Sequence, residues 1–363
     1  MMINKKTAKL LLPCLIALAA LFPAKAQVQP AIRISTLDDL RKVGKSADYP
    51  LNADYELVSD IDASLTRTKP FEPIGGNVYP FTGRFYGENG AVFVIRNLYI
   101  NRPDSGYAGL FGAIGYDGEV ANVGVVAYVA GHYAVGTLAG ASNGNVVNCY
   151  GAGTVAAKRG ESNAGGLVGV NGGSISKSYS SASVDGRENV GGLAGLLMIA
   201  PAGEISDCFA VGNVSGSNAV GGLVGLAFGG RIESCFSGGM AAGKSGKGFV
   251  GGLVGKDFAV SPPWSDRGVF EIDGVAYYVE AVAARASFWD MGASRASVSA
   301  AGEGKSSAEM MSRGTFLGWD FDRTWSLVEG VHYPQLAAIP MYTHTLAYSV
   351  DNEECGRLNV SSG

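Results

Sequence analysis

The sequence predicts an all-β fold, namely a right-handed parallel β-helix whose coils contain roughly 26–30 residues. Three observations lead to this prediction. Glycine accounts for 54 of the 363 residues, about twice its usual share. A Gly-x-Leu-x-Gly core recurs through the middle of the chain at nearly constant intervals. No repeat contains an apolar pattern with the period of about 3.6 residues that a helix requires.

The leucines of the repeated core define the unit. They are separated by 28, 29, 26, 30 and 30 residues, and they are Leu110, Leu138, Leu167, Leu193, Leu223 and Leu253. One such unit cannot bury its own apolar face, but stacked copies bury a continuous core. A β-propeller blade usually needs about 40–50 residues, so the shorter spacing favours a solenoid. We expect these leucines to be buried and stacked on consecutive coils.

Two further positions repeat after four of the leucines, from Leu138 to Leu223. A small residue or a thiol occupies the first, as at Cys149, Ser178, Cys208 and Cys235. Free cysteine packs well in a core, and side chains in register point the same way, so we expect reduced thiols rather than disulfides. The following residue is aromatic, at Tyr150, Tyr179, Phe209 and Phe236, and these rings are expected to form an outward stack.

A column of corner residues precedes the thiol position. Its members are Asn97, Asn122, Asn148, Lys177, Asp207 and Ser234. Asparagine tolerates the left-handed conformation and bonds its own backbone, so tight corners explain this column. Glycan-cleaving enzymes need carboxylates that converge on one face, and this column pairs none on neighbouring coils. We therefore interpret the column as structural.

The repeats resemble the GLUG motif of bacterial surface proteins, in which Gly-Gly-Leu-Val-Gly precedes Ile-x-x-Cys/Ser-Tyr/Phe. Residues 55–62, 71–75 and 81–87 resemble the opening segment of that family, and residues 288–290, 318–325 and 333–336 its closing segment. The resemblance covers about residues 31–340. It implies a secreted or surface-exposed protein, and several family members are regarded as adhesins. The family also includes immunoglobulin-A1 metallopeptidases, in which such repeats accompany a catalytic domain.

The amino terminus has the features of a signal peptide. A basic stretch is followed by apolar residues 10–22 and by a small-x-small site that ends at Ala26, so we expect cleavage after residue 26. The chain is thus expected to be exported, to the cell surface or medium, with the periplasm as an alternative. The other expected segments are an N-terminal cap at 27–75 with a helix after Thr36, the repeats at 76–256, a loop insertion and closing coils at 257–340, and the start of a further β-domain or a tail at 341–363.

Few residues suggest metal or cofactor chemistry. Asp54, Asp60 and Asp62 are the weak candidates for calcium ligands, because hard oxygen atoms suit that ion. The chain has 3 histidines and no His-Glu-x-x-His motif, so the resemblance to metallopeptidases does not extend to their catalysis. We expect no cofactor and no catalytic residue within this sequence, with the reservation that a catalytic domain beyond Gly363 would change that.

The function predicted is a non-catalytic secreted or surface module for adhesion or ligand binding. The alternatives are the recognition or stalk region of a larger secreted enzyme, or a glycan-active β-helix enzyme. The sequence does not identify a partner; a host glycan and an extracellular protein are the candidates. Nucleic acid is not expected, because the formal net charge is −4. No segment after the signal peptide is apolar enough to span a membrane.

The candidate binding surface lies on two departures from the repeat. One is the longer stretch after Leu193, which contains Leu197 and Met198. The other is the segment at 257–285, which contains Trp264, Tyr277 and Tyr278. Insertions in solenoids map to loops on one face, and aromatic residues on such loops often anchor an interface. The alternative is that the two segments merely cover each other.

Overall fold

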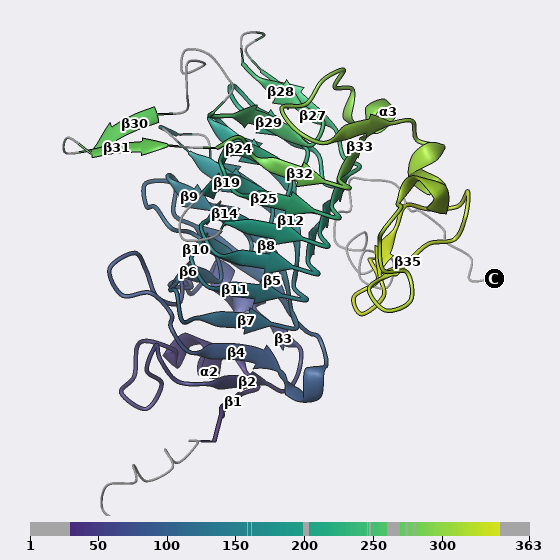
Figure 1. Ribbon diagram of the computed structural model, residues 1–363. Coiled ribbons are helices and arrows are strands. Elements are labelled where there is room, and N and C mark those ends of the chain that lie inside the picture. The colour runs from purple at the N-terminus through teal and green to yellow at the C-terminus, as the bar shows by residue number, and fades with distance from the viewer. Residues whose placement is uncertain are drawn as a thin grey trace, which may run out of the picture. The chain divides into compact units, whose positions relative to one another are not determined.

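The repeats form a β-solenoid of about seven turns, with coils of about 29 residues, within the part of the chain that the computed structural model describes. Those residues are 30–157, 159–160, 162–198, 203–244, 246, 248–259, 269–272, 275–278 and 280–341. Figure 1 shows the short strands of successive coils stacked in parallel ladders. The predicted parallel β-helix is thereby confirmed. Among the described residues, no helix is both long and apolar enough to cross a bilayer.

Four parallel ladders make the walls of the solenoid. Sheet A follows the order β1 (Ile32–Ile34), β2 (Tyr55–Leu57), β4 (Arg84–Gly87), β7 (Glu119–Ala121), β11 (Asn145–Val147), β15 (Ser174–Ser176), β20 (Glu204–Ser206), β25 (Arg231–Glu233) and β32 (Ala283–Arg285). Sheet C contains β6 (Phe111–Ile114), β10 (Ala139–Ser142), β14 (Val168–Asn171), β19 (Ala194–Met198), β24 (Val224–Phe228) and β29 (Val254–Asp257). Sheet D contains β9 (Ala134–Val135), β13 (Asn163–Gly165), β18 (Asn189–Gly191), β23 (Val220–Gly221) and β28 (Val250–Gly251).

Sheet B is the largest of the four walls. It contains β3 (Ile61–Asp62), β5 (Phe93–Asn101), β8 (Val123–Ala130), β12 (Tyr150–Ala157), β16 (Tyr179–Ser180), β17 (Ser183–Gly186), β21 (Phe209–Ala210), β22 (Val214–Gly216), β26 (Phe236–Ser237), β27 (Ala241–Gly243), β33 (Phe288–Asp290) and β34 (Glu303–Lys305). Two antiparallel hairpins lie outside the ladders, namely β30 (Val269–Ile272) with β31 (Val275–Tyr278), and β35 (Trp325–Ser326) with β36 (Gln335–Leu336). The helical segments of the described residues are α2 (Leu37–Lys42), α3 (Met291–Ser294), η1 (Ser64–Arg67), η2 (Glu88–Gly90), η3 (Glu309–Met311) and η4 (Arg313–Thr315).

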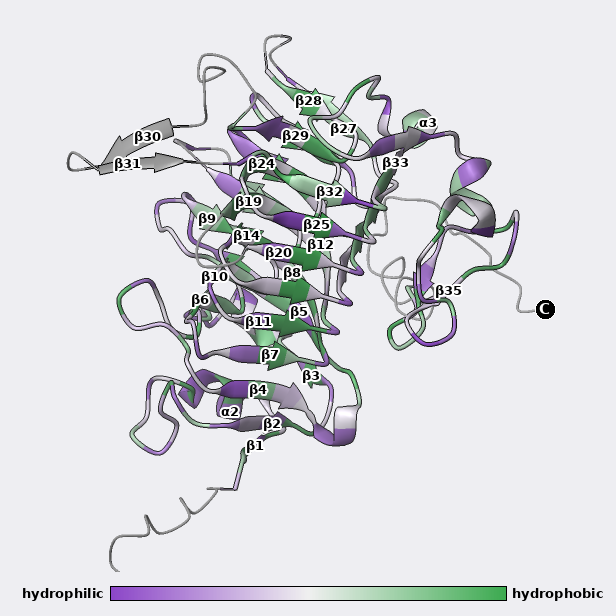
Figure 2. Cartoon of the chain, viewed as in Figure 1, coloured by the Kyte–Doolittle hydropathy of each residue, from purple (hydrophilic) through white to green (hydrophobic). Residues whose placement is uncertain are grey.

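The repeated leucines form the centre of the core, as predicted. All of them are fully buried, at 0 % exposure. The amide of Leu167 donates to the carbonyl of Leu193 at 3.0 Å, and the amide of Leu193 donates to the carbonyl of Leu223 at 2.9 Å. Figure 2 shows the accompanying alternation on β25, where an apolar isoleucine lies between arginine and glutamate. On this strand one side faces the core and the other faces solvent.

Close approach of backbones explains the glycines of the motif. A Cβ atom on Gly191 would collide with the carbonyl oxygen of Ala194, and one on Gly192 would collide with the carbonyl oxygen of Gly222 on the next coil. A Cβ atom on Gly195 would collide with the backbone of the preceding coil. Only glycine fits at these positions, because the obstacles are main-chain atoms that cannot rotate away.

The predicted corner column is confirmed by its backbone geometry. Every member has a positive φ, with values of 58° at Asn97, 59° at Asn122, 53° at Asn148, 47° at Lys177, 50° at Asp207 and 53° at Ser234. This is the left-handed region that asparagine and aspartate tolerate best. From Asn122 onward the column turns the chain from sheet A into sheet B on each coil, whereas Asn97 lies at a register shift within β5.

The thiols are free and buried, as predicted. Cys149, Cys208 and Cys235 form no disulfide and lie in the core. Burial raises the pKa of Cys149 to about 12, although backbone hydrogen bonds oppose the shift. Burial and the neighbouring Cys235 raise the pKa of Cys208 well above its ordinary value. Because the thiolate is the reactive form, these side chains are inert packing residues.

The ladder begins earlier than the sequence predicts. Helix α2 lies where it was expected, with the amide of Asp39 donating to Oγ1 of Thr36 at 3.1 Å as the N-terminal cap. However, β1 already pairs with β2, and β2 with β4. Sheet A therefore starts at Ile32, inside the segment predicted to be a separate cap.

The carboxyl-terminal part of the solenoid is the main departure from prediction. Strands β32, β33 and β34 extend the ladders as closing coils. Residues 306–341 do not add another coil, and instead pack against the outer side of sheet B. The reason is their composition, since Phe316, Trp319 and Trp325 require an apolar surface to bury against.

That apolar surface is the aromatic column, which we call the covered stack (Tyr150, Tyr179, Phe209 and Phe236). Successive ring centroids lie 5.1, 4.7 and 5.0 Å apart, and the planes are within 6° of parallel. The rings form a cluster separate from the inner core, so the predicted outward stack is confirmed. They are nevertheless at most 1 % exposed, because other residues cover them. The ring centroid of Trp325, for example, lies 6.2 Å from those of both Phe209 and Phe236.

Candidate functional site

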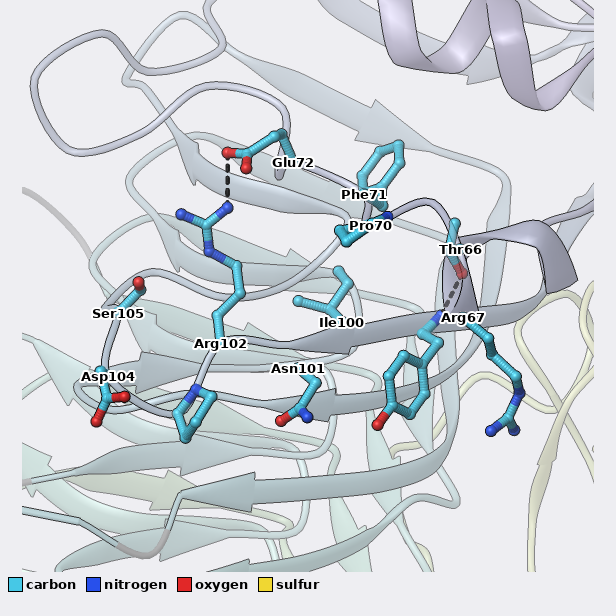
Figure 3. A pocket seen from close by; sticks show the side chains of 12 residues that line it. Thr66, Arg67, Pro70, Phe71, Glu72, Ile100, Asn101, Arg102, Asp104 and Ser105 are labelled. Carbon is cyan, nitrogen blue, oxygen red and sulfur yellow. Dashed lines mark hydrogen bonds and ion pairs between the residues drawn. The ribbon is translucent and has the colours of Figure 1, made fainter.

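A groove of about 470 Å³ lies beside the first coils of sheet B. One wall runs from Thr66 to Glu72 and includes the end of η1. The other wall runs from Tyr99 to Ser105 and includes the end of β5. Figure 3 shows the side chains that line it, with Asp104 and Ser105 at one end and Arg67 at the other.

Polar contacts hold the two walls together. The backbone amide of Tyr99 donates to Oγ1 of Thr66 at 2.8 Å, and that hydroxyl donates to the carbonyl of Ala63 at 2.6 Å. Thr66 is buried, so this link is protected from water. Across the groove, Nη1 of Arg102 lies 2.6 Å from Oε2 of Glu72, as Figure 3 shows. The groove is therefore a preformed feature of the fold.

Tyr99, which is partly buried, lines the groove and stacks on the exposed ring of Tyr128, and we call this pair the exposed stack (Tyr99 and Tyr128). The two residues are register partners on β5 and β8. Their ring centroids lie 5.1 Å apart and their planes are 13° from parallel. The guanidinium carbon of Arg67 lies 5.0 Å from the ring centroid of Tyr99. Tyr128 is 37 % exposed, so this stack is accessible where the covered stack is not.

The weak calcium candidates do not form a site. Asp54 pairs with Arg84, and hydrogen bonds and charge from that arginine hold the pKa of Asp54 below its ordinary value despite partial burial. Asp60 pairs with Arg96, at 2.9 Å. Asp62 accepts hydrogen bonds from Ser64 and Asn97. Within the described ranges, no three acidic, cysteine or histidine side chains converge as metal ligands would.

Of the five residues predicted for the binding surface, one lies in the core, one is half-buried and three have side chains outside the described part of the structure. Leu197 lies on β19 and is 0 % exposed in the core, so its assignment to a binding surface is wrong. The side chain points inward because β19 continues the ladder, with Leu197 paired to Ala227. Its neighbour Met198 is half-buried. Tyr277 and Tyr278 belong to β31, but their side chains and the whole of Trp264 lie outside the described residues.

The groove and the exposed stack were missed by the sequence analysis. One signal was present, since Tyr99 and Tyr128 are separated by the length of one coil, 29 residues. That spacing predicts neighbouring rings in any solenoid with this repeat. The wall formed by residues 66–72 gave no signal, because it belongs to no repeat.

Comparisons with known proteins agree with the fold and the repeat. The model of the family described as "The GLUG motif" matches residues 186–215 and 216–241. Halomucin from Haloquadratum walsbyi is 32% identical over 146 residues, which is 38% of this chain and 2% of that protein. A "Putative Gly-rich membrane protein" from Evansella cellulosilytica is 39% identical over 94 residues, which is 25% of this chain and 10% of that protein. The chain thus matches only a small part of each relative.

A solved structure shares the fold. It is the crystal structure of a "putative immunoglobulin A1 protease" from Bacteroides ovatus, with a TM-score of 0.53 and 20% sequence identity. The likeness covers 85% of this chain and 93% of the other. At this identity the likeness concerns the architecture alone. The chain thus carries two GLUG motifs, at residues 186–215 and 216–241, on a parallel β-solenoid that resembles the solved structure.

Proposed function

We propose that this protein is a non-catalytic, exported module of the bacterial surface that binds a ligand and contributes to adhesion. The observation that carries the proposal is the exposed stack beside a preformed groove, on a wall whose other aromatic stack is covered. A half-exposed ring on a rigid ladder costs little entropy to order when a ligand binds. Binding sites generally combine such an apolar surface with a few placed polar groups.

The charges around the groove also support binding over catalysis. Glu72 pairs with Arg102, and Asp104 pairs with Arg159. Both carboxylates already face an arginine, so neither is left as a lone acid directed into the groove. These pairs instead provide a fixed pattern of polar groups along the groove.

A second candidate is the recognition region of a larger secreted enzyme. The observation that favours it is the likeness to the solved structure named as a putative immunoglobulin A1 protease, which this chain nearly covers from end to end. In that case the same surface would hold a substrate that another domain cleaves.

Binding and turnover measurements on residues 27–363 distinguish these functions. The protein is applied to arrays of host glycans and extracellular matrix proteins, and each bound ligand is then incubated with it and analysed by mass spectrometry. We expect binding with no cleavage of the ligand. Cleavage of a bound glycan or protein by this chain alone would contradict the proposal, and so would the absence of binding to every array component. Labelling of intact cells with a membrane-impermeant reagent tests the surface location.

A further inference from the structure

The exposed stack ends on one side with an uncovered aromatic face. On the ladder of sheet B, Tyr128 is the register partner of Tyr99 on one side and of Thr154 on the other. Thr154 is in turn the partner of Ser183. Thr154 and Ser183 are both exposed and short, so no ring continues the stack beyond Tyr128. The outer face of Tyr128 is therefore a platform with hydroxyl groups beside it.

The other side of the stack ends in a cation. Arg67 is exposed, and its guanidinium lies against Tyr99. The arginines around it are paired with carboxylates, since Arg102 contacts Glu72 and Arg96 contacts Asp60. Among the described residues, Arg67 has no carboxylate within ion-pair distance. A guanidinium that contacts a ring and lacks a carboxylate partner keeps N–H groups available for a planar anion.

We propose that the exposed stack and Arg67 form a binding site for an acidic oligosaccharide, one whose sugar rings carry carboxylates. The axial C–H groups of a pyranose ring give it an apolar face, which packs on the open face of Tyr128. Its hydroxyls then lie near the hydroxyls of Thr154 and Ser183. A carboxylate further along the chain is bound by Arg67. The inference rests on the proposed binding function and names the ligand class of its site.

The geometry requires a ligand longer than one sugar. The platform and the guanidinium lie at opposite ends of a stack of two rings whose centroids are 5.1 Å apart. A monosaccharide can contact one end or the other, and an oligomer can contact both. The groove continues past Tyr99 and offers the polar groups of Asn101 and Ser105 to further units.

The decisive variant is Thr154→Tyr, which fills the site without removing any native contact. Because the position is exposed on a strand, a tyrosine there extends the stack and occupies the open face of Tyr128. Binding of tetragalacturonate and of sialyllactose is measured by isothermal titration calorimetry at low salt. We expect the native chain to bind one of them with a Kd of about 1 mM or tighter, and Thr154→Tyr to weaken that binding at least about tenfold with an unchanged Tm.

Two further variants separate the parts of the site. Tyr128→Ala removes the platform and should weaken binding by about tenfold. Arg67→Gln should weaken binding of the acidic oligosaccharide and abolish its salt dependence. Tyr116→Ala is the matched control, because Tyr116 is an exposed tyrosine that lies outside the groove and the stack. Its affinity should equal that of the native chain.

Comparison ligands test the chemical class. Maltotetraose, which is neutral, should bind the native chain more weakly than the acidic oligosaccharide does. Its affinity for Arg67→Gln should equal its affinity for the native chain. If tetraglutamate binds as well as the acidic oligosaccharide and responds to the same variants, the site recognises anionic peptides and the inference is overturned. It is also overturned if neither acidic oligosaccharide binds at about 10 mM.

The test also separates this inference from the proposed function. If the native chain binds a glycan or matrix protein and Thr154→Tyr binds it equally well, the module binds ligands elsewhere and only the inference fails. If no ligand of any kind binds, the proposed function fails as well.

Discussion

Sheet B carries two aromatic stacks, and they differ in what lies over them. The covered stack and the exposed stack follow the same rule, in which register partners on consecutive coils place ring against ring. The centroid distances are also alike, at 5.1 Å between Tyr150 and Tyr179 and 5.1 Å between Tyr99 and Tyr128. Residues 306–341 pack on the first stack at Phe209 and Phe236, whereas the second borders an open groove. Stacking alone is thus structural, and accessibility makes a stack available for binding.

The largest effect on stability is expected from removing Trp325, the residue through which residues 306–341 pack on the covered stack. Trp325 is 1 % exposed, contacts Phe209 and Phe236, and donates through Nε1 to Asp207 at 3.2 Å. Trp325→Ala should lower the free energy of unfolding by about 3–5 kcal/mol. Urea unfolding followed by circular dichroism measures this change. A loss below about 1 kcal/mol would show that residues 306–341 are not integral to the flank.

The inner core provides the reference for that measurement. Leu193 is fully buried between Leu167 and Leu223, so Leu193→Ala leaves a cavity inside the solenoid. We expect a loss of about 2–5 kcal/mol in the same assay. If Leu193→Ala were nearly neutral, the assignment of the repeated leucine to the core would be wrong.

A matched pair of truncations compares the two stacks directly. Tyr179→Ala removes a ring that is 1 % exposed, and it should cost about 3–5 kcal/mol. Tyr128→Ala removes a ring that is 37 % exposed, and it should cost about 1 kcal/mol or less. Differential scanning calorimetry of both variants gives the comparison. Equal losses would show that Tyr128 is as structural as Tyr179.

The smallest expected effect concerns the carboxyl group of Asp207, which accepts the hydrogen bond from Trp325. Burial raises the pKa of Asp207 above its ordinary value, against the hydrogen bond from Trp325 and the charge of Lys177. The folded state therefore destabilises the ionised form, and this cost is present above the folded pKa and vanishes at low pH. Asp207→Asn keeps an acceptor for Trp325 and tolerates the positive φ of 50°.

We accordingly expect Asp207→Asn to be more stable than the native chain at about pH 7, by about 1 kcal/mol or less, and the advantage to shrink as the pH falls. Urea unfolding midpoints across this range provide the measurement. A variant that is less stable at neutral pH, with a deficit that disappears on acidification, would mean that the carboxylate stabilises the fold.

The comparison also shows what the sequence could predict. The periodic features were accessible, because a repeat of about 29 residues places leucines, corner residues and aromatic residues in register. The packing of residues 306–341 on the covered stack could not be predicted, because Trp325 and Asp207 are 118 positions apart and no repeat connects them. The exposed stack could have been recognised from the spacing of Tyr99 and Tyr128. The groove could not, because residues 66–72 adopt their path only through contacts such as that of Thr66 with Tyr99.

The most direct test of the difference between the stacks is nitration of the native protein with tetranitromethane, followed by peptide mass spectrometry. The reagent acts on exposed phenolate, and burial raises the pKa of Tyr179 far above its ordinary value. We predict that Tyr128 is modified while Tyr150 and Tyr179 remain unmodified until the protein is unfolded. Modification of Tyr179 at the rate of Tyr128 in the folded protein would contradict the account, because the two stacks would then be equally open to solvent.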